Sequence, residues 1–276
     1  MSAEPRVTIA MPVYNARAYL REALESVLAQ TYPRWELVAI DDASTDESWD
    51  LLNEYAARDP RVRLFRQPVQ SGIVAARNRA IAEAHPASTY LAVLDADDVA
   101  LPDRLEAQLA FLDAHPDHAL LGGHTLIIDA EARSLGLRRY PSDYAQICSA
   151  ITRFNPFAQS AVMIRRSVLD EVGGYDPAYP RCQDYDLWLR IAAKHPVANL
   201  DRPLIRYRIS DAQGKRTHLR QTLDLTLRIQ RRWLFHPRFF RLRNAAFVAL
   251  EHGLTLLPDV AILALFKRVR YATEPS

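Results

Sequence analysis

Three short polar clusters follow apolar runs in the first hundred residues of the chain. They are PVYN (12–15), DDAS (41–44) and DADD (95–98). Two of them contain adjacent carboxylates, whose like charges destabilise each other unless a cation or a hydrogen-bond donor lies nearby. Capping of the helices that follow would explain any one cluster. Three clusters in equivalent positions favour a binding site for a charged ligand.

Asp95 and Asp97 are suited to bind a hard divalent cation. Mg²⁺ and Mn²⁺ prefer oxygen ligands, keep some of their waters, and complete their coordination with substrate phosphates. The two carboxylates lie one residue apart, directly after the apolar run at 90–94. A D-x-D pattern alone is weak evidence, but its position at the end of a strand-like run strengthens it. We therefore expect a divalent metal, Mn²⁺ or Mg²⁺, at this site.

The elements that must position these clusters alternate between strand and helix. Apolar runs at 7–13, 36–40, 62–65 and 90–94 predict strands, and the apolar spacing after each run predicts a helix. This alternation predicts an α/β fold with a doubly wound, mostly parallel sheet and helices on both faces. Because ligands of such sheets bind at the carboxyl ends of the strands, the three clusters should face one crevice.

The rest of the chain has a more mixed pattern. Strands are predicted at 161–164 and 204–207, a helix at 185–193, and helical segments after residue 214 that break at Pro237 and Pro258. We predict a main domain at 1–214 and a basic helical C-terminal extension at 215–276. Within the main domain, residues 6–123 form a donor-binding half and residues 124–214 an acceptor and base half.

The charge is unevenly distributed along the 276 residues. Residues 1–200 contain 20 Lys and Arg against 27 Asp and Glu, whereas residues 201–276 contain 15 against 6. Arginines mixed with aromatic residues between Arg228 and Arg243 predict peripheral contact with an anionic membrane. The alternative is a solvated extension that packs its aromatic residues on the domain. No nucleic-acid partner is expected.

The N-terminus lacks the features of a signal peptide, and no uninterrupted apolar run approaches the roughly 20 residues that span a bilayer. The two cysteines, Cys148 and Cys182, have no disulfide-framework or zinc-site spacing. The expected location is the cytoplasm, at the inner face of the membrane if the extension binds there.

The order of the motifs resembles that of the family 2 glycosyltransferases, which have the GT-A fold of the nucleotide-diphospho-sugar transferases. The matching segments are PVYN (12–15), DDAST (41–45), SGIVAARN (71–78), LDADD (94–98), VGGYDPAY (172–179) and QDYDLWLR (183–190). The resemblance covers about residues 6–210, and six motifs in this order are highly specific. It implies an inverting transferase that moves a sugar from a nucleotide diphosphate, with UDP favoured, to a hydroxyl acceptor in bacterial-type polysaccharide, lipopolysaccharide or glycolipid assembly.

The resemblance also implies a role for each matched residue. The nucleotide-sugar would contact Pro12, Tyr14, Asn15, Asp42, Arg77, Asn78, Asp95 and Ala96. Within this set Tyr14 and Asp42 would bind the nucleobase, and Asp95 would contact the ribose. Asp97, with Asp95, would hold the metal on the diphosphate. Asp184 would be the catalytic base.

A carboxylate in the position of Asp184 makes chemical sense for this reaction. It would take the proton of the acceptor hydroxyl as that oxygen attacks the anomeric carbon. A base on the face opposite the leaving group gives a single displacement, and hence inversion. Without the resemblance, Asp184 could instead be a helix N-cap, and Asp186 is its nearest rival as the base.

The sequence departs from the family pattern at two points. Gln183 stands where relatives often have Glu, and Ile209 follows Tyr207-Arg208 where many have a His shortly after this pair. His218 is a candidate substitute as a metal ligand.

Two other functions fit part of the pattern. A sugar-nucleotide nucleotidyltransferase shares the topology, but would normally have a glycine-rich loop and a lysine after the first strand, where this chain has PVYNARAYL. A non-catalytic sugar-nucleotide-binding protein could also keep the fold. The presence of both Asp97 and Asp184 counts against it.

Overall fold

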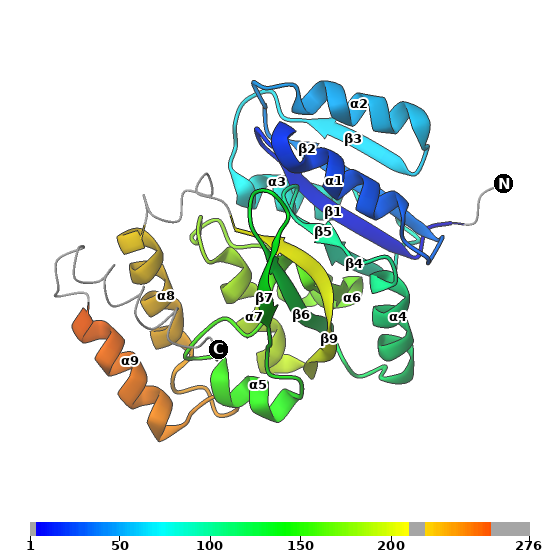
Figure 1. Ribbon diagram of the computed structural model, residues 1–276. Helices are drawn as coiled ribbons and strands as arrows, with labels where there is room; N and C mark the ends of the chain where they lie inside the picture. The colour runs from blue at the N-terminus through cyan, green and yellow to red at the C-terminus, as the bar shows by residue number, and fades with distance from the viewer. Residues whose placement is uncertain (1–3, 210–218, 255–276) are drawn as a thin grey trace.

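The computed structural model describes residues 4–209 and 219–254. Within these residues nine strands form one sheet, with the order β3-β2-β1-β4-β8-β6-β9-β5 and β7 paired to β6 (Figure 1). The strands are β1 (Val7–Val13), β2 (Trp35–Asp41), β3 (Val62–Arg66), β4 (Tyr90–Val93), β5 (Val99–Ala100), β6 (Leu120–Ile128), β7 (Ser134–Arg138), β8 (Met163–Arg165) and β9 (Val197–Arg208). The helices are α1 (Arg17–Leu28), α2 (Ser48–Arg58), α3 (Ile73–Ala82), α4 (Arg104–Ala114), α5 (Tyr144–Ala150), α6 (Arg166–Val172), α7 (Gln183–Lys194), α8 (Leu219–Trp233) and α9 (Leu242–Leu254).

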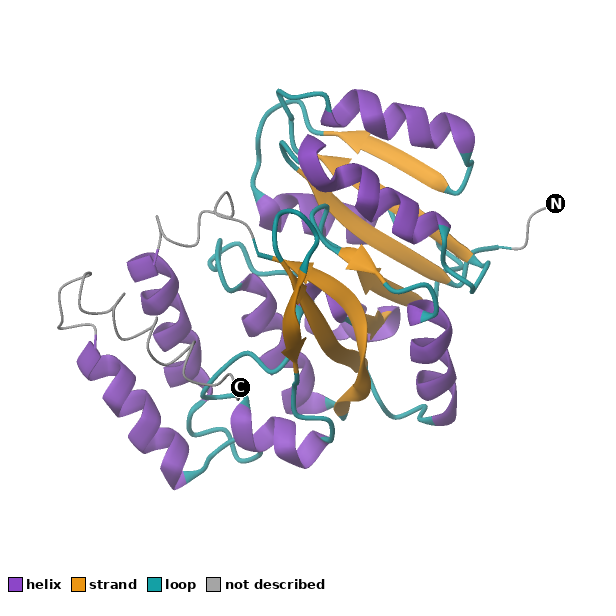
Figure 2. Ribbon diagram, in the orientation of Figure 1, coloured by secondary structure: helices purple, strands orange, loops and turns teal. Residues whose placement is uncertain are grey.

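Helices cover both faces of the sheet, as the continuous apolar runs predicted (Figure 2). Successive strand residues point to opposite faces, so a strand with two covered faces is apolar throughout. In β1, Ile9 and Met11 join one core with α1, α2 and α4, whereas Ala10 joins the other core with α3 and α7. All seven residues of β1 are buried.

The sheet is parallel in its N-terminal half and mixed beyond it. β1 pairs in parallel with β2 and β4, and β2 with β3. β8 then runs antiparallel between β4 and β6, and β9 pairs in parallel with β6. The prediction of an α/β, mostly parallel sheet with helices on both faces is confirmed. The sequence did not predict β6, β7 and the short β5.

The sheet opens between β1 and β4. Their pairing ends at Ala10 and Val93. The carbonyl of Ala10 accepts from the Leu94 N–H, so Pro12, two residues later, faces the same side. Because β4 has already diverged there, the missing N–H of Pro12 leaves no ladder bond unmade. The space between the two strand ends is where the polar clusters meet.

The C-terminal helices pack on the half of the domain that contains α7 (Figure 1). Ile229 of α8 and Phe239 of the following connection are fully buried in the same core as Trp188. The Sγ of Cys182 lies 3.4 Å from Thr226 Oγ1 in α8. The helical pattern breaks near Pro237, as predicted, whereas Pro258 lies outside the described residues. In the described part of the chain, no helix is both long and apolar enough to cross a bilayer.

Candidate active site

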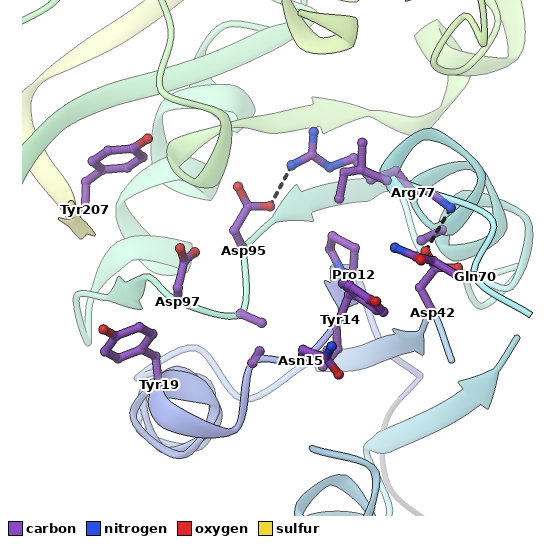
Figure 3. A pocket seen from close by; sticks show the side chains of 16 residues that line it. Pro12, Tyr14, Asn15, Tyr19, Asp42, Gln70, Arg77, Asp95, Asp97 and Tyr207 are labelled. Carbon is purple, nitrogen blue, oxygen red and sulfur yellow. Dashed lines mark hydrogen bonds and ion pairs between the residues drawn. The ribbon is translucent and has the colours of Figure 1, made fainter. Parts of the chain in front are cut away.

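A cavity of about 470 Å³ lies at the carboxyl ends of β1, β2 and β4 (Figure 3). Its walls bring together most of the residues that the sequence singled out. The lining residues are Pro12, Val13, Tyr14, Asn15, Ala16, Tyr19, Asp42, Gln70, Gly72, Ile73, Ala76, Arg77, Asp95, Ala96, Asp97 and Tyr207. Figure 3 shows Asp42 and Gln70 at one end, Asp95 and Asp97 at the other, and Pro12, Tyr14 and Asn15 between them. The three polar clusters therefore face one crevice, as their positions predicted.

Asp42 fixes one end of the cavity. Its two carboxylate oxygens accept hydrogen bonds from the backbone N–H groups of Ser71 and Gly72, at 2.7 and 2.8 Å. These bonds hold the loop that begins α3 across the end of β2. A carboxylate oxygen has two lone pairs, so Asp42 can still accept a further hydrogen bond from a ligand. Tyr14 is 45 % exposed and offers an aromatic face beside it.

The backbone that carries Asn15 and Ala43 is held in an uncommon conformation. Both residues have positive φ, 46° and 59°. Asn adopts this region readily, whereas Ala does so at some cost. The Asn15 side chain accepts from Thr45 N–H at 2.8 Å, and Asn15 N–H donates to Ser44 Oγ at 3.0 Å. The first two polar clusters are thus bonded to each other.

Hydrogen bonds and an ion pair from neighbouring elements hold the acidic end of the cavity in place. The Arg77 Nη2 group pairs with Asp95 Oδ1 at 2.7 Å, and the Asp95 N–H donates to Ser160 Oγ. Arg208 is fully buried and donates from Nε to the Asp97 carbonyl at 3.0 Å and from its backbone N–H to Asp98 Oδ1 at 2.8 Å. The loop that carries Asp97 is therefore fixed to the end of β9.

Negative charge accumulates at this end. Burial, together with the charges of Asp97 and Asp95, raises the pKa of Asp98 well above its ordinary value. Within the described residues, no group of three or more His, Cys, Asp or Glu side chains has the arrangement of a complete metal site. Oxygen donors in an acidic loop fit Mg²⁺ or Mn²⁺, provided that water and substrate phosphates supply the remaining ligands.

Three lining residues with polar side chains had no role assigned from the sequence. Tyr19 and Tyr207 lie on either side of Asp97, and Gln70 lies beside Asp42 (Figure 3). Burial and the charges of Asp98, Asp95 and Asp97 raise the pKa of Tyr207, so its hydroxyl stays protonated and can donate. The Tyr-Arg pair at the end of a predicted strand was the only sequence signal for Tyr207.

Asn78 was expected to contact the nucleotide-sugar, but it does not line the cavity. Its amide exchanges two hydrogen bonds of 2.8 Å with the backbone N–H and carbonyl of Tyr175. A Cβ on Gly174 would lie 2.5 Å from Asn78 Oδ1, so this close approach requires glycine. Neighbouring helix residues point about 100° apart, so Arg77 faces the cavity while Asn78 holds the 173–175 loop against α3.

Asp184 lies in the first turn of α7, is partly exposed, and is not among the residues that line the cavity. The Asn155 Nδ2 group donates to Asp184 Oδ2 at 2.8 Å. Burial raises the pKa of Asp184, although the positive charge of Arg77 and the Asn155 hydrogen bond partly counteract it. Arg77 therefore interacts with both Asp95 and Asp184. Asp184 is not the helix N-cap, since that position is Cys182, in a left-handed conformation.

Asp186, the rival base, has a structural role instead. It is fully buried and pairs with Arg190 Nε at 2.8 Å, one helical turn later. The same guanidinium donates to the carbonyls of Val172 and Gly174. This pair fixes the 172–174 loop to α7, and Asp186 has no open side toward an acceptor. His218, the candidate metal ligand, lies outside the described residues.

Comparison with known proteins agrees with the motif order. The chain matches the family model described as Glycosyl transferase family 2 over residues 8–173. EpsE of Bacillus subtilis (strain 168), which is named as a glycosyltransferase, is 34% identical over 193 residues, which cover 69% of this chain and 68% of EpsE. WcaA of Escherichia coli (strain K12), which is named for colanic acid biosynthesis, is 29% identical over 208 residues. The match covers 71% of this chain and 69% of WcaA.

Solved structures share the fold. The mannosyltransferase PcManGT of Pyrobaculum calidifontis, in complex with GDP-Man and Mn²⁺, has a TM-score of 0.66 at 20% identity and covers 97% of this chain and 81% of its own. S. aureus TarS, in complex with UDP-GlcNAc, has a TM-score of 0.67 at 18% identity. The match covers 89% of this chain and 71% of the TarS chain. At these identities the likeness concerns the arrangement of the sheet and helices.

Proposed function

Given that this chain belongs to the family 2 glycosyltransferases and has the GT-A fold, we propose that it is an inverting, metal-dependent enzyme. In this proposal it transfers a sugar from a nucleotide diphosphate to a hydroxyl acceptor. The family establishes glycosyl transfer; the donor, the metal and the stereochemistry are proposed from the site.

The proposed donor extends along the cavity from Asp42 to Asp97. The nucleobase would lie at the Asp42 end, where Tyr14 offers a stacking face and Gln70 an amide. The ribose would contact Asp95, and the diphosphate would lie against Asp97. UDP is the proposed nucleotide. TarS was solved with UDP-GlcNAc and PcManGT with GDP-Man, so a guanine nucleotide is the alternative to test.

Asp97, with Asp95, would hold the divalent metal on the diphosphate. One Asp95 oxygen is already paired with Arg77, so Asp97 is the main proposed protein ligand. The ion would neutralise the charge that develops on the leaving diphosphate. The Mn²⁺ in the PcManGT complex supports this expectation by analogy of fold. His218 would be an added ligand.

Asp184 is the proposed base. Its carboxylate would accept the proton of the acceptor hydroxyl while that oxygen forms the new bond to the anomeric carbon. The bond from that carbon to the diphosphate oxygen would break in the same step, with its electron pair leaving on the nucleotide. Attack from the face opposite the leaving group inverts the configuration.

The observation that carries the proposal is the contrast between the environments of two carboxylates, Asp97 and Asp184. Asp97 lines the cavity, whereas Asp184 lies outside this lining in the first turn of α7, where burial raises its pKa. Carboxylates in different environments can take different roles, here cation binding and proton acceptance. A nucleotidyltransferase would need no base at the Asp184 position. A non-catalytic binding protein would need no proton-accepting carboxylate there.

The proposed pathway is assembly of a bacterial-type polysaccharide, lipopolysaccharide or glycolipid. WcaA is named for colanic acid biosynthesis, which is polysaccharide assembly. The proposed location is cytoplasmic. We also propose the division into a main domain at 1–214 and an extension at 215–276.

The test is a screen of nucleotide-sugars by thermal shift, with and without Mn²⁺, followed by donor hydrolysis and transfer assays. Metal-dependent stabilisation by a UDP-sugar and release of UDP are expected. Stabilisation without any turnover, on any acceptor class including water, would support a binding protein. Release of pyrophosphate from a sugar phosphate and UTP would identify a nucleotidyltransferase instead.

A further inference from the structure

The solvent-facing side of α9 is apolar, whereas a surface helix normally exposes polar residues. Leu242 is 81 % exposed and Leu250 is 67 % exposed. At 3.6 residues per turn, the helix places one stripe of residues on the same side. The stripe, all of it exposed, consists of Leu242, Ala246, Ala249, Leu250 and Gly253. We name these residues the α9 face.

The opposite side of the same helix contains polar residues. Asn244 is fully buried, and its amide donates to Thr152 Oγ1 at 2.7 Å. Glu251 is half-buried, and burial raises its pKa. The inward side also contains the buried Val248, and exposed Arg243 and His252 flank the outward stripe. Because the centre of the outward side is apolar, the helix suits an apolar external environment.

Two phenylalanines continue the apolar surface next to the start of α9. Phe235 is 75 % exposed and Phe240 is 40 % exposed, and their rings stack with centroids 5.8 Å apart. Phe240 lies only two residues before Leu242. Phe239, which lies between Phe235 and Phe240 in the sequence, is fully buried. The connection therefore directs some aromatic side chains inward and others to the surface.

The charge around this surface is positive. Residues 219–254 contain seven Arg against one Asp and one Glu, a net charge of +5. All seven arginines are exposed: Arg220, Arg228, Arg231, Arg232, Arg238, Arg241 and Arg243. Residues 4–209 carry 23 Lys and Arg against 28 Asp and Glu, a net charge of −5. An anionic surface would therefore attract the α8–α9 end and repel the rest of the molecule.

We propose that the α9 face, with Phe235 and Phe240, binds an anionic lipid bilayer peripherally. The apolar side chains would enter the boundary between headgroups and acyl chains, while the surrounding arginines would contact lipid phosphates. A second copy of this chain fits less well, because a symmetric contact would bring two surfaces of the same positive charge together.

Binding of the α9 face to a bilayer would also affect how a lipid-anchored acceptor reaches the enzyme. α8 lies between α9 and α7 (Figure 1) and is packed on α7 through Cys182 and Thr226. The helix that begins beside Asp184 is therefore fixed relative to the proposed bilayer surface. An acceptor anchored in the same lipid would be held close to the enzyme without a separate binding domain.

The test is vesicle co-sedimentation with the full chain. Vesicles of phosphatidylcholine with phosphatidylglycerol as a major component are compared with phosphatidylcholine alone. Binding to the anionic vesicles that weakens with salt is expected. Leu242→Ser/Leu250→Ser should lower the affinity roughly tenfold or more through lost apolar burial. Arg241→Gln should lower it about fivefold, since each arginine at an anionic surface contributes about that factor.

The matched control is Leu135→Ser on β7, where the leucine is 53 % exposed on the acidic body. It should leave vesicle binding unchanged. Circular-dichroism melting and nucleotide-sugar affinity should be the same for all variants, which excludes unfolding as the cause of lost binding.

Three results would overturn the proposal. The first is failure of the wild-type chain to bind anionic vesicles at low salt. The second is unchanged binding by the Leu242→Ser/Leu250→Ser variant, which would place the contact elsewhere. The third is a concentration-dependent dimer that the same double variant abolishes, together with absent vesicle binding. That outcome would assign the α9 face to self-association. Since vesicle binding needs no donor or turnover, its failure is distinguishable from failure of the proposed reaction.

Discussion

Replacement of Asp184 by Asn is expected to abolish most turnover while preserving the site. Asn has nearly the same shape, and its side-chain oxygen can still accept the 2.8 Å hydrogen bond from Asn155. It cannot accept the acceptor proton. Loss of a general base lowers the rate by roughly 10²–10⁴, which corresponds to about 3–5 kcal/mol of transition-state stabilisation. Donor affinity should persist, because Asp184 does not line the donor cavity.

The pH dependence gives a second signature of the same group. Burial raises the pKa of Asp184, so the base becomes protonated at a higher pH than an exposed aspartate would. The wild-type kcat/KM should therefore fall as pH decreases through this raised pKa, and the variant should lack this acidic decrease.

Stability should depend on the same group, because the folded state binds the Asp184 proton more tightly than the unfolded state. The ionised carboxylate therefore destabilises the fold at neutral pH, and this effect disappears below the unfolded pKa. Asp184→Asn should be at least as stable as wild type at neutral pH.

The assay is the initial rate against pH, with donor affinity and thermal melting measured on the same preparations. Asp170→Asn provides the control, since Asp170 is exposed on the neighbouring helix α6 and its loss changes the net charge equally. Near-normal turnover by Asp184→Asn, or an equal loss of turnover in Asp170→Asn, would refute the assignment of the base.

Three further variants test the roles of other residues. Asp97→Asn should remove most of the Mn²⁺-dependent UDP affinity measured by calorimetry, with little change in melting temperature; unchanged affinity would exclude a metal role. Asp186→Asn should lower the free energy of unfolding by about 2–3 kcal/mol in urea titration, because it leaves the buried Arg190 contact without its carboxylate. A stable Asp186→Asn that has lost turnover would reverse the roles of the two aspartates. Ala43→Gly should raise the free energy of unfolding by up to about 1 kcal/mol, since Ala43 has a φ of 59°; a clear decrease would mean that the backbone is not strained there.

Local sequence patterns predicted the first half of the fold and the three polar clusters that meet in the cavity. The strands that carry the three clusters are continuous apolar runs because both of their faces are buried, and this pattern is visible without a structure. The positions of Tyr14, Asp42 and Asp97 follow from it. A strand was predicted at 161–164, where β8 lies, but its antiparallel position between β4 and β6 was not predictable, because the pairing joins segments far apart in the sequence.

The supporting residues were harder to predict for the same reason. Arg208 fixes the Asp97 carbonyl across 111 positions of sequence, and no local pattern indicates that contact. Asn78 was assigned to the cavity because it follows Arg77 in a motif, although adjacent helix positions face different directions. The Asp186–Arg190 pair could have been found, since its spacing is that of neighbours on one helix face.

The most direct test of the proposed mechanism is the anomeric configuration of the first product formed by the wild-type enzyme. A UDP-sugar of known configuration and a hydroxyl acceptor are incubated with Mn²⁺, and the product is followed by NMR from the earliest time points. A single displacement assisted by Asp184 predicts that the new glycosidic bond has the configuration opposite to that of the donor. A product that retains the donor's configuration would contradict the single-displacement mechanism.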